Sequence, residues 1–356
     1  MSKTILITGG AGFVGSSLAL RFRNDFPAFH IIVFDNLKRR GSELSLNEFK
    51  KLGIDFIHGD IRCAEDLDQI PAFDIMIEAS AEPSVLAGLE SGPQGVINNN
   101  FLGSINCFNL CVKYNAKVIF LSTSRVYPIA NIEAARFLED ETRFSFSAAQ
   151  DIEGISEKGI SEKLSLNGAR SFYGATKLAS EMFLQEYAEF YNIKSVITRF
   201  GVIAGPRQMG KTDQGVISLW MARHFWKLPL KYIGYGGKGK QVRDVLHIDD
   251  LIRLVYFQVN NIDLFANKVF NAGGGIESSA SLCELTKLCE KITGNRINVG
   301  EEPENRPADL RIYITDNSRI SLESGWKPEK NVEMILTDIF AWLHANETEL
   351  KKIFAN

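Results

Sequence analysis

The sequence predicts an α/β fold built on a doubly wound, mostly parallel β-sheet, followed by a smaller C-terminal α+β lobe. Over the first 200 residues, short apolar runs typical of buried strands alternate with helical stretches. A glycine-rich turn directly follows the first of these runs. After residue 200 the regular alternation is lost, because shorter strands separate the helices.

Six apolar runs supply the expected strands of the sheet. They are rich in Ile, Val, Leu and Phe, which is typical of parallel strands buried on both faces. The helical stretches between them make the right-handed crossovers that parallel strands require. The expected strands are residues 3–8, 30–35, 54–58, 73–79, 116–122 and 194–200.

The turn after the first strand carries three glycines at intervals of three residues. Its sequence is Gly9-Gly10-Ala11-Gly12-Phe13-Val14-Gly15. Gly9 allows a tight turn, Gly12 lets the backbone approach a pyrophosphate, and Gly15 lets the next helix pack against the strand. The phosphates would lie at the N-terminus of a helix that starts near Phe13 and Val14. This pattern predicts a Rossmann-type dinucleotide site.

Asp35 ends the second strand, twenty residues after Gly15. A carboxylate at this place would hold the adenosine ribose hydroxyls, with Asn36 beside it. Its charge would repel a 2′-phosphate, which favours NAD over NADP. Basic residues follow closely at 38–40 and would tolerate that phosphate, so the preference is moderate.

Three further strand ends offer cofactor contacts. Asp60 and the backbone of Ile61 would meet the adenine edge, although a plain strand-ending turn explains them nearly as well. Small residues after the fourth strand leave room for a cofactor across the carboxyl ends of the sheet. These are Ala79, Ser80 and Ala81, and the fifth strand delivers Ser122 and Thr123 to the same edge. Glu78 is unusual so close to phosphates, and we expect it to be salt-bridged.

Tyr173 and Lys177 open an amphipathic helix that runs to Tyr191. Their i, i+4 spacing puts the phenol and the ammonium on one helix face. A tyrosine with a pKa of about 10 is a poor base at neutral pH, and an adjacent positive charge would lower that pKa. Such a pair also occurs by chance in many helices, so it gains weight only together with the glycine turn and the Ser/Thr cluster.

Taken together, these features resemble the extended short-chain dehydrogenase/reductase family over essentially the whole chain. The matching residues are Gly9-x-x-Gly12-x-x-Gly15, Asp35, Asp60, Ser122-Thr123, Tyr173 and Lys177. The resemblance implies that Tyr173 is the general base, that Lys177 lowers its pKa and holds the nicotinamide ribose, and that Thr123 binds the reacting sugar oxygen. It also implies NAD as cofactor, a nucleotide-linked sugar as substrate, and a homodimer or homotetramer.

Departures from the family pattern limit which of the family's reactions this chain is expected to catalyse. Sugar 4,6-dehydratases carry an Asp-Glu pair where this chain has Ser124 and Arg125. Neither residue does that acid–base chemistry at neutral pH, so dehydration is disfavoured and both become candidate substrate contacts. Val202 replaces an Asn that is usual in dehydratases and 4-epimerases, which implies a different sugar contact.

Two later segments resemble the CDP-paratose (CDP-tyvelose) 2-epimerase branch of the family. One contains Gln214 and Gly215, and the other is the glycine-rich stretch 234–247. Within the second segment, Arg243 is suited to bidentate contact with a diphosphate. Arg306 stands where relatives place another phosphate-binding arginine. Each arginine alone is equally well explained as a solvated surface residue.

One motif competes with this interpretation. Gly205-x-x-x-x-Gly210-Lys211-Thr212 satisfies the P-loop pattern. Pro206 removes a donor amide, however, and Asp213 would place a negative charge where phosphates should bind. We therefore disfavour ATP or GTP hydrolysis.

Composition excludes several partner classes. The chain has 356 residues, of which 45% are hydrophobic and 23% charged, and a net charge of −3 offers no basic field for nucleic acid. No apolar run approaches the roughly 18 residues that span a bilayer. No signal-peptide pattern precedes the first strand, so we expect a cytoplasmic protein without membrane partners.

The five cysteines form no Cys-x-x-Cys pair. They are Cys63, Cys107, Cys111, Cys283 and Cys289. Cys107 and Cys111 share a helix face without a nearby histidine, which makes a poor metal site. We expect reduced, mostly buried thiols and no bound metal.

Two domains are expected. Residues 1–199 form the NAD-binding Rossmann domain, residues 200–356 form the nucleotide-sugar-binding lobe, and residues 242–272 are a candidate to rejoin the first domain. The later helices are expected at 215–227, 249–259, 281–293 and 331–345, and the later strands at 230–234, 268–272, 297–300 and 311–315. An acidic insertion between Pro128 and Arg170 is a candidate lid or oligomer contact.

The expected function is an NAD-dependent nucleotide-sugar epimerase that removes a hydride and returns it, at C2 of a CDP-linked deoxyhexose. The alternatives are a UDP-sugar 4-epimerase or another NAD-dependent sugar-nucleotide oxidoreductase. A redox-sensing binding protein without catalysis is disfavoured, because Tyr173 and Lys177 are both present.

Overall fold

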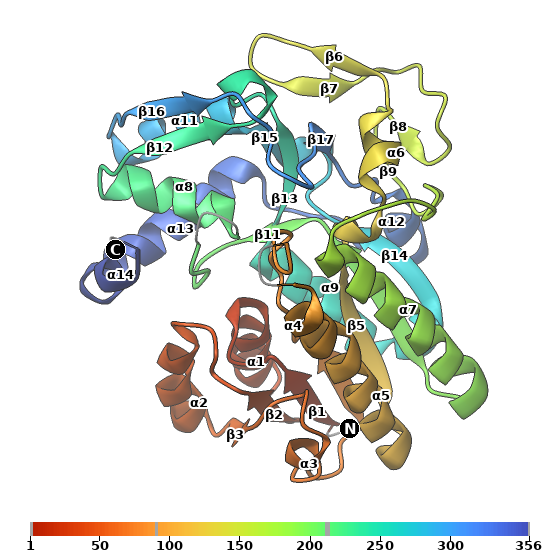
Figure 1. Ribbon diagram of the computed structural model, residues 1–356. Helices are drawn as coiled ribbons and strands as arrows, with labels where there is room; N and C mark the ends of the chain where they lie inside the picture. The colour runs from red at the N-terminus through yellow and green to blue at the C-terminus, as the bar shows by residue number, and fades with distance from the viewer. Residues whose placement is uncertain (1–2, 90–91, 211–213, 355–356) are drawn as a thin grey trace. The chain divides into compact units, whose positions relative to one another are not determined.

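The computed structural model describes residues 3–89, 92–210 and 214–354 (Figure 1). Their contacts divide the chain into two compact units. The first unit consists of Met1–Thr123, Phe172–Arg199 and Leu251–Val269, and the second of Ser124–Ser171, Phe200–Asp250 and Phe270–Asn356.

A seven-stranded sheet organises the first unit, in the order β14-β10-β5-β4-β1-β2-β3. The neighbours β3-β2-β1-β4-β5 are all paired in parallel. The strands are β1 (Lys3–Thr8), β2 (Phe29–Asp35), β3 (Asp55–His58), β4 (Ile75–Glu78), β5 (Lys117–Thr123), β10 (Ser195–Phe200) and β14 (Lys268–Ala272). All six expected strands are present, and the doubly wound Rossmann-type sheet is confirmed.

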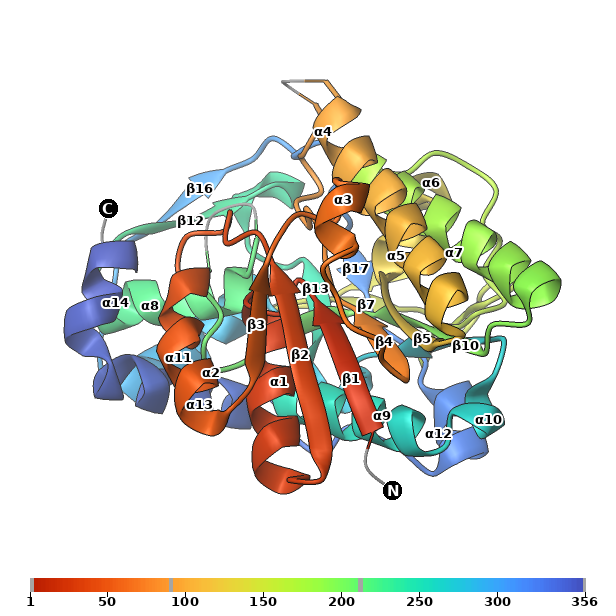
Figure 2. The same ribbon diagram turned by 90° about the horizontal axis from the view of Figure 1, so that it is seen from below.

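Helices cover both faces of this sheet. Figure 2 shows α5 (Gly103–Tyr114) and α7 (Phe172–Tyr191) on one face, and α1 (Phe13–Asp25) with α9 (Ile248–Asn260) on the other. Aromatic side chains connect α1 and α9, since the ring of Phe26, the residue directly after α1, stacks on Tyr256 of α9 with centroids 3.6 Å apart. The shorter helices of this unit are α2 (Leu46–Leu52), α3 (Ala64–Leu67), α4 (Gln94–Val96) and α10 (Ile262–Phe265).

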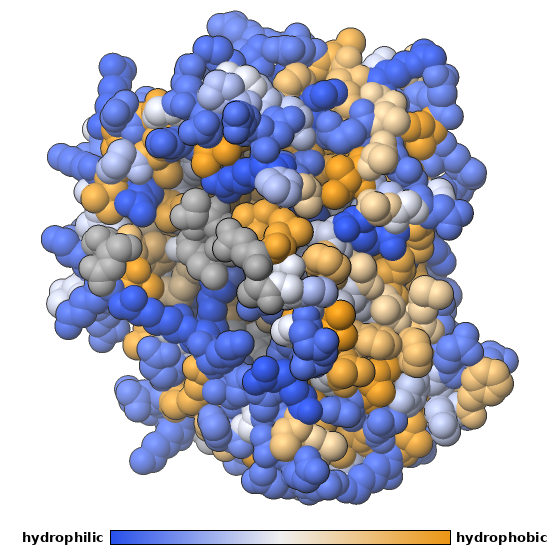
Figure 3. All heavy atoms as spheres, viewed as in Figure 1, coloured by the Kyte–Doolittle hydropathy of each residue, from blue (hydrophilic) through white to orange (hydrophobic). Residues whose placement is uncertain are grey.

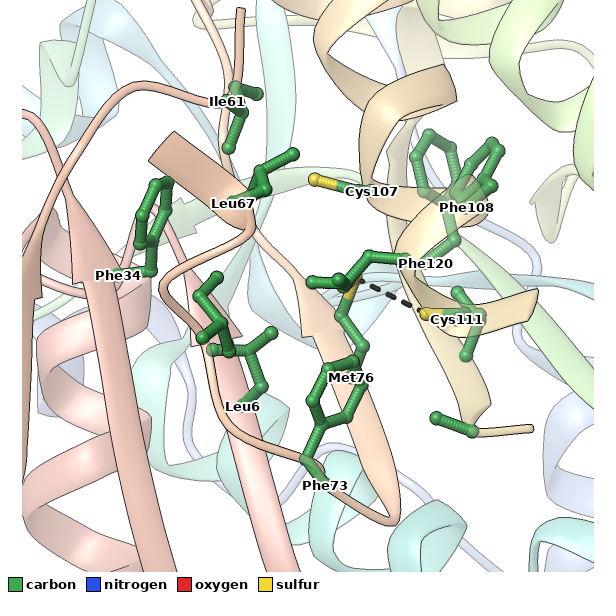
Figure 4. Close-up of a cluster of buried hydrophobic side chains, with 14 of the residues drawn as sticks. Leu6, Phe34, Ile61, Leu67, Phe73, Met76, Cys107, Phe108, Cys111 and Phe120 are labelled. Carbon is green, nitrogen blue, oxygen red and sulfur yellow. Dashed lines mark hydrogen bonds between the residues drawn. The ribbon is translucent and has the colours of Figure 1, made fainter. Parts of the chain in front are cut away.

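The core of the first unit lies between the sheet and α5 (Figure 4). Cys107 and Cys111 point into this core, and the sulfur of Cys111 lies 3.7 Å from that of Met76. All five cysteines are free thiols, and three of them are buried. The expectation of reduced, mostly buried cysteines is confirmed.

The helix before β5 contains a π-helical segment. α4 runs directly into this segment, Ile97–Leu102, which α5 continues. The carbonyl oxygen of Asn100 accepts hydrogen bonds from the hydroxyls of Ser104, at 2.8 Å, and Ser180, at 3.0 Å. These bonds occupy a carbonyl that an α-helix would use itself, which favours the wider turn.

The second unit is built on β13 (Val242–His247), which pairs with three other strands. The partners of β13 are β11 (Val202–Ala204), β15 (Ser279–Ser281) and β17 (Ile312–Tyr313). Two-stranded sheets join β12 (Leu230–Ile233) to β16 (Val299–Glu302), β6 (Phe137–Glu139) to β7 (Phe144–Phe146), and β8 (Ile155–Ser156) to β9 (Gly159–Ile160). The helices are α6 (Ile129–Glu133), α8 (Val216–Phe225), α11 (Leu282–Thr293), α12 (Ser318–Ser324), α13 (Val332–Ala345) and α14 (Glu347–Phe354).

The observed division of the chain differs from the boundary expected at residue 199 in two respects. Only Leu251–Val269 joins the first unit, whereas β13 belongs to the second, because its strand partners lie there. The insertion also groups with the second unit. Its Phe144 amide donates to Lys240, at 3.0 Å, and its Ile160 amide donates to Ile314, at 2.8 Å. Its role as a lid or oligomer contact stays a prediction.

Candidate functional site

The glycine turn after β1 has the geometry of a phosphate-binding loop. Gly9 has a φ of +61°, and a Cβ at Gly15 would lie 2.3 Å from the Gly9 carbonyl oxygen, so neither position tolerates a side chain. A Cβ at Gly12 would meet only that same oxygen, at 3.2 Å. α1 starts at Phe13 without a side-chain cap or an acid in its first turn. Its first amides, including those of Val14 and Gly15, therefore offer donors and a positive dipole end to a diphosphate.

Asp35 is tied to this turn. One carboxylate oxygen accepts the amide of Ala11 at 3.0 Å, and the other accepts the amide of Leu37 at 2.7 Å. Burial raises the pKa of the Asp35 carboxyl, and these two amides act in the opposite direction. The acid is thus fixed at the end of β2, beside the turn, where a ribose contact requires it.

Asn36 and Asp60 are brought together from neighbouring strand ends. The Asn36 side chain donates to Asp60 at 2.9 Å, and Arg62 donates to both oxygens of the same carboxylate. The Arg62 hydrogen bonds hold the pKa of Asp60 well below its usual value. The Ile61 side chain is buried in the core, and its carbonyl accepts from Asn106 at 2.9 Å.

The end of β4 lies directly against the glycine turn. The amide of Ala79 donates to the Thr8 carbonyl at 3.3 Å, and a Cβ at Gly9 would lie 2.7 Å from the Cα of Ser80. Ser80 is buried, and Ala81 after it is half-buried. These small residues let the two strand ends approach closely.

Lys177 lies at the same edge of the sheet and is almost fully buried. Its Nζ is 3.3 Å from Oε2 of Glu78, at the end of β4, and 3.9 Å from the centre of the Phe120 ring, in β5. Glu78 is completely buried. Its expected salt bridge is present, and the partner of Glu78 in it is Lys177, the candidate catalytic lysine. Tyr173 lies one helical turn before Lys177 in α7 and is half-buried.

Thr123 and Ser122 end β5, against which α7 packs. Both are buried. The Ser122 hydroxyl donates to Glu181 in α7, and the Arg199 guanidinium binds the same carboxylate at 2.6 Å. The structure therefore gives Ser122 a partner within the protein, on the helix that carries Tyr173.

Three of the expected substrate contacts converge on one loop of the second unit. Arg125 donates to the carbonyl of Ala308 at 3.2 Å, and Arg243 donates to the carboxylate of Asp309 at 2.7 Å. Arg306 belongs to the same loop, and its carbonyl accepts the amide of Asp309 at 3.3 Å. The guanidinium groups of Arg125 and Arg243 therefore lie at the loop that carries Arg306, and arginines are suited to binding an anionic group such as a diphosphate.

The remaining expected substrate contacts are more scattered. Ser124 is buried in the turn after β5, and Gln214 is half-buried. Gly215, with a φ of +74°, precedes α8. Lys211, Thr212 and Asp213, which complete the competing P-loop motif and its neighbour, lie outside the described residues.

The Glu181–Arg199 pair was missed at the sequence level, although two signals pointed to it. Arg199 stands inside the apolar run 194–200, and a charged residue in a buried strand requires a partner. Glu181 is four residues after Lys177, on the same face of α7.

Residues 3–89, 92–210 and 214–354 hold no group of three or more His, Cys, Asp or Glu side chains arranged to bind a metal ion. None of their helices combines the length and the apolar character needed to cross a bilayer.

Comparisons with known proteins agree with this geometry. Residues 5–273 match the model of the NAD dependent epimerase/dehydratase family. The CDP-paratose 2-epimerase of Salmonella typhi is 29% identical over 347 residues, covering 95% of this chain and 98% of that protein. A putative UDP-glucose 4-epimerase of Methanocaldococcus jannaschii is 27% identical, covering 96% of this chain and 99% of that protein.

A solved structure is similar over the same length. The UDP-glucose 4-epimerase of Thermotoga maritima with UDP-glucose superposes with a TM-score of 0.77 at 26% identity, covering 97% of this chain and 99% of that one. The predicted family and the NAD cofactor are both confirmed by the family match. With its glycine turn, its fixed Asp35 and its full-length relatives, the chain belongs to the NAD-dependent epimerase/dehydratase family.

Proposed function

We propose that this protein is a nucleotide-sugar epimerase that removes a hydride from a sugar carbon and returns it to the opposite face. The expected position is C2 of a CDP-linked deoxyhexose. The observation that carries the proposal is the buried Lys177 ammonium, one helical turn from Tyr173, at the sheet edge that also holds the glycine turn.

The residues of the first unit fit NAD. The uncapped start of α1 and the glycine turn would hold the diphosphate, and Asp35 would hold the adenosine ribose. Asp60 and Ile61 would lie towards the adenine, and Ala79, Ser80 and Ala81 would line the sheet edge. When bound, NAD supplies the acceptor and donor of the hydride.

Tyr173 would take the proton of the reacting hydroxyl and return it after the flat ketone has presented its other face. The charge of Lys177 would favour the phenolate form of this tyrosine. Thr123 would hold the reacting oxygen through its hydroxyl. The sugar is not oxidised overall, because the hydride returns to the same carbon and the proton returns to the oxygen on that carbon.

The substrate class is supported by the second unit and by the relatives. Arg125, Arg243 and Arg306 gather at one loop, which is suited to a diphosphate. Ser124, Gln214 and Gly215 remain candidate sugar or nucleotide contacts. A CDP-paratose 2-epimerase and UDP-glucose 4-epimerases are among the relatives, so CDP stands first and UDP is the alternative.

The alternatives differ in their products. A UDP-sugar 4-epimerase would change C4 of a UDP-sugar and leave C2 unchanged. A net oxidoreductase would release NADH in proportion to the sugar that it converts.

Product analysis tests the proposal. The purified protein is incubated with CDP-, UDP- and GDP-linked sugars, and NMR follows the configurations at C2 and C4. Inversion at C2 of a CDP-sugar is expected. Inversion at C4 alone, or release of free NADH, would instead establish one of the alternatives.

Tyr173→Phe tests the chemistry itself. Loss of the phenol should lower turnover by at least about a hundredfold, because no other group would take the hydroxyl proton. Tyr191→Phe is the matched control, since Tyr191 ends the same helix with 59% of its surface exposed, and it should keep full activity. Full activity in Tyr173→Phe would refute the proposed base.

We also propose a homodimer or homotetramer. Large apolar side chains of α7 are exposed, among them Met182 at 59% and Phe190 at 75%. Figure 3 shows apolar surface over the part of the view where Figure 1 draws α5 and α7. A second copy packed on these helices would bury that surface.

A further inference from the structure

The carboxylate of Glu78 is placed to act on the proposed base through Lys177. Glu78 ends β4, next to Thr8 of β1 and Phe120 of β5 in the sheet register. Its side chain is completely buried. One oxygen accepts the amide of Ser80 at 3.1 Å, and the other lies 3.3 Å from Nζ of Lys177. Both oxygens are therefore engaged.

Lys177 is held on two sides. Its side chain is 2% exposed, and its Nζ lies over the Phe120 ring, 3.9 Å from the centroid. An ammonium has three N–H donors, and Glu78 takes one, which leaves two for a tyrosine oxygen and a ribose. The carboxylate thereby fixes the direction in which those two donors point.

The charge of the pair matters as much as its geometry. A buried ammonium acts strongly on a nearby phenol, because the interior screens charge weakly. A carboxylate 3.3 Å from that ammonium offsets most of its charge. The Lys177–Glu78 pair would then act on the Tyr173 phenol as a dipole and not as a full positive charge.

We propose that Glu78 is a positioning residue that, through Lys177, sets the pH at which Tyr173 becomes the base. The inference rests on the proposed epimerase function, because it assigns Tyr173 the role of base. It goes beyond that function, because it proposes that Glu78, and not Lys177 alone, controls the pH at which Tyr173 ionises.

Other titratable groups face this pair from neighbouring elements. Cys107 of α5 interacts with both Glu78 and Lys177, and burial raises the pKa of its thiol well above the usual value. It is therefore uncharged at working pH. On α7, Lys177 shares its helix face with Tyr173, one turn before it, and with Glu181, one turn after it. Burial raises the pKa of Glu78, and Lys177 acts in the opposite direction.

The test measures the ionisation of Tyr173 directly in the NAD-loaded protein. Ultraviolet difference spectra recorded against pH report all tyrosines, and subtraction of the Tyr173→Phe spectra isolates Tyr173. In Glu78→Gln, the tyrosine should ionise about one pH unit lower, because the ammonium loses its counter-charge. The acid limb of kcat/KM against pH should shift by the same amount. An unchanged ionisation, or one at higher pH, would overturn the inference.

Two further variants separate charge from shape and from loss of folding. Glu78→Asp keeps the carboxylate but moves it away from Lys177 by one methylene. It should therefore shift the Tyr173 ionisation in the same direction as Glu78→Gln, but by less. This variant replaces Glu78→Gln if the latter fails to fold. Glu181→Gln is the matched control. It also removes a buried carboxylate, one turn further along α7, but this carboxylate is paired with Arg199 and not with Lys177. It should leave the Tyr173 ionisation in place, and an equal shift in this variant would overturn the inference.

This design separates failure of the inference from failure of the proposed function. The spectroscopic ionisation needs no substrate, so it reports on Glu78 even if no sugar is converted. An inactive Tyr173→Phe with an unshifted Glu78→Gln would refute only the role of Glu78. A fully active Tyr173→Phe would refute the proposed base, whatever Glu78→Gln does.

Discussion

The two units of the protein accommodate buried charge in different ways. In the first unit, α7 carries two buried ion pairs one turn apart, Lys177 with Glu78 and Glu181 with Arg199. In the second unit, the completely buried Asp244 of β13 is held by backbone amides, those of Gly275 at 3.1 Å and Thr315 at 3.2 Å.

Because of this difference, the stability of the two units should depend differently on mutation and on pH. A carboxylate paired with a guanidinium is compensated by a full charge, so removing one partner leaves the other unpaired and buried. A carboxylate held by amides receives only partial charges, and burial raises the pKa of Asp244 to about 6. The first arrangement is sensitive to mutation, whereas the second is sensitive to pH.

The largest effect is expected from breaking the structural ion pair of α7. Glu181→Ala should lower the free energy of unfolding by about 3–5 kcal/mol, because the buried Arg199 guanidinium would lose the carboxylate that it binds. Urea denaturation measures the loss. The double variant Glu181→Leu/Arg199→Met removes both charges and should recover most of it. A double variant as unstable as the single one would show that packing, and not the unpaired charge, is responsible.

A smaller effect with a defined pH dependence is expected at Asp244. Its pKa is raised from 3.8 to about 6, so the folded state binds this proton more tightly than the unfolded state. The resulting stabilisation is complete below pH about 4 and is lost as the pH rises through about 6. Relative to Asp244→Asn, the wild type should therefore lose roughly 2–3 kcal/mol between pH 4 and 7.

Thermal and urea unfolding of both proteins across this pH range checks the expectation for Asp244. A constant difference between wild type and Asp244→Asn would mean that Asp244 does not titrate differently on folding.

The smallest expected effect sharpens the role of Ser122. Ser122→Ala removes a hydrogen bond to the Glu181 carboxylate and should cost about 2 kcal/mol of stability. Affinity for NAD, measured by calorimetry, should change by less than about twofold, because the hydroxyl is already engaged within the protein. A large loss of NAD affinity with unchanged stability would instead assign this hydroxyl to the cofactor.

The parallel sheet, the glycine turn and the position of Asp35 could be predicted from the amino-acid sequence. These features follow from local patterns, since apolar runs form strands, and only glycine fits the close backbone contacts at Gly9 and Gly15. The spacing of Tyr173 and Lys177 is local too, because four residues along a helix return to one face.

The partners of the buried charged groups became known only from the folded structure. Glu78 reaches Lys177 across 99 residues of sequence, and Ser122 reaches Glu181 across 59. It also decided that β13 belongs to the second unit and that Asn100 widens its helix, through Ser180. The physical reason is that local sequence patterns fix backbone conformation and buried faces, whereas the partner of a buried polar group depends on which distant segment the fold brings beside it.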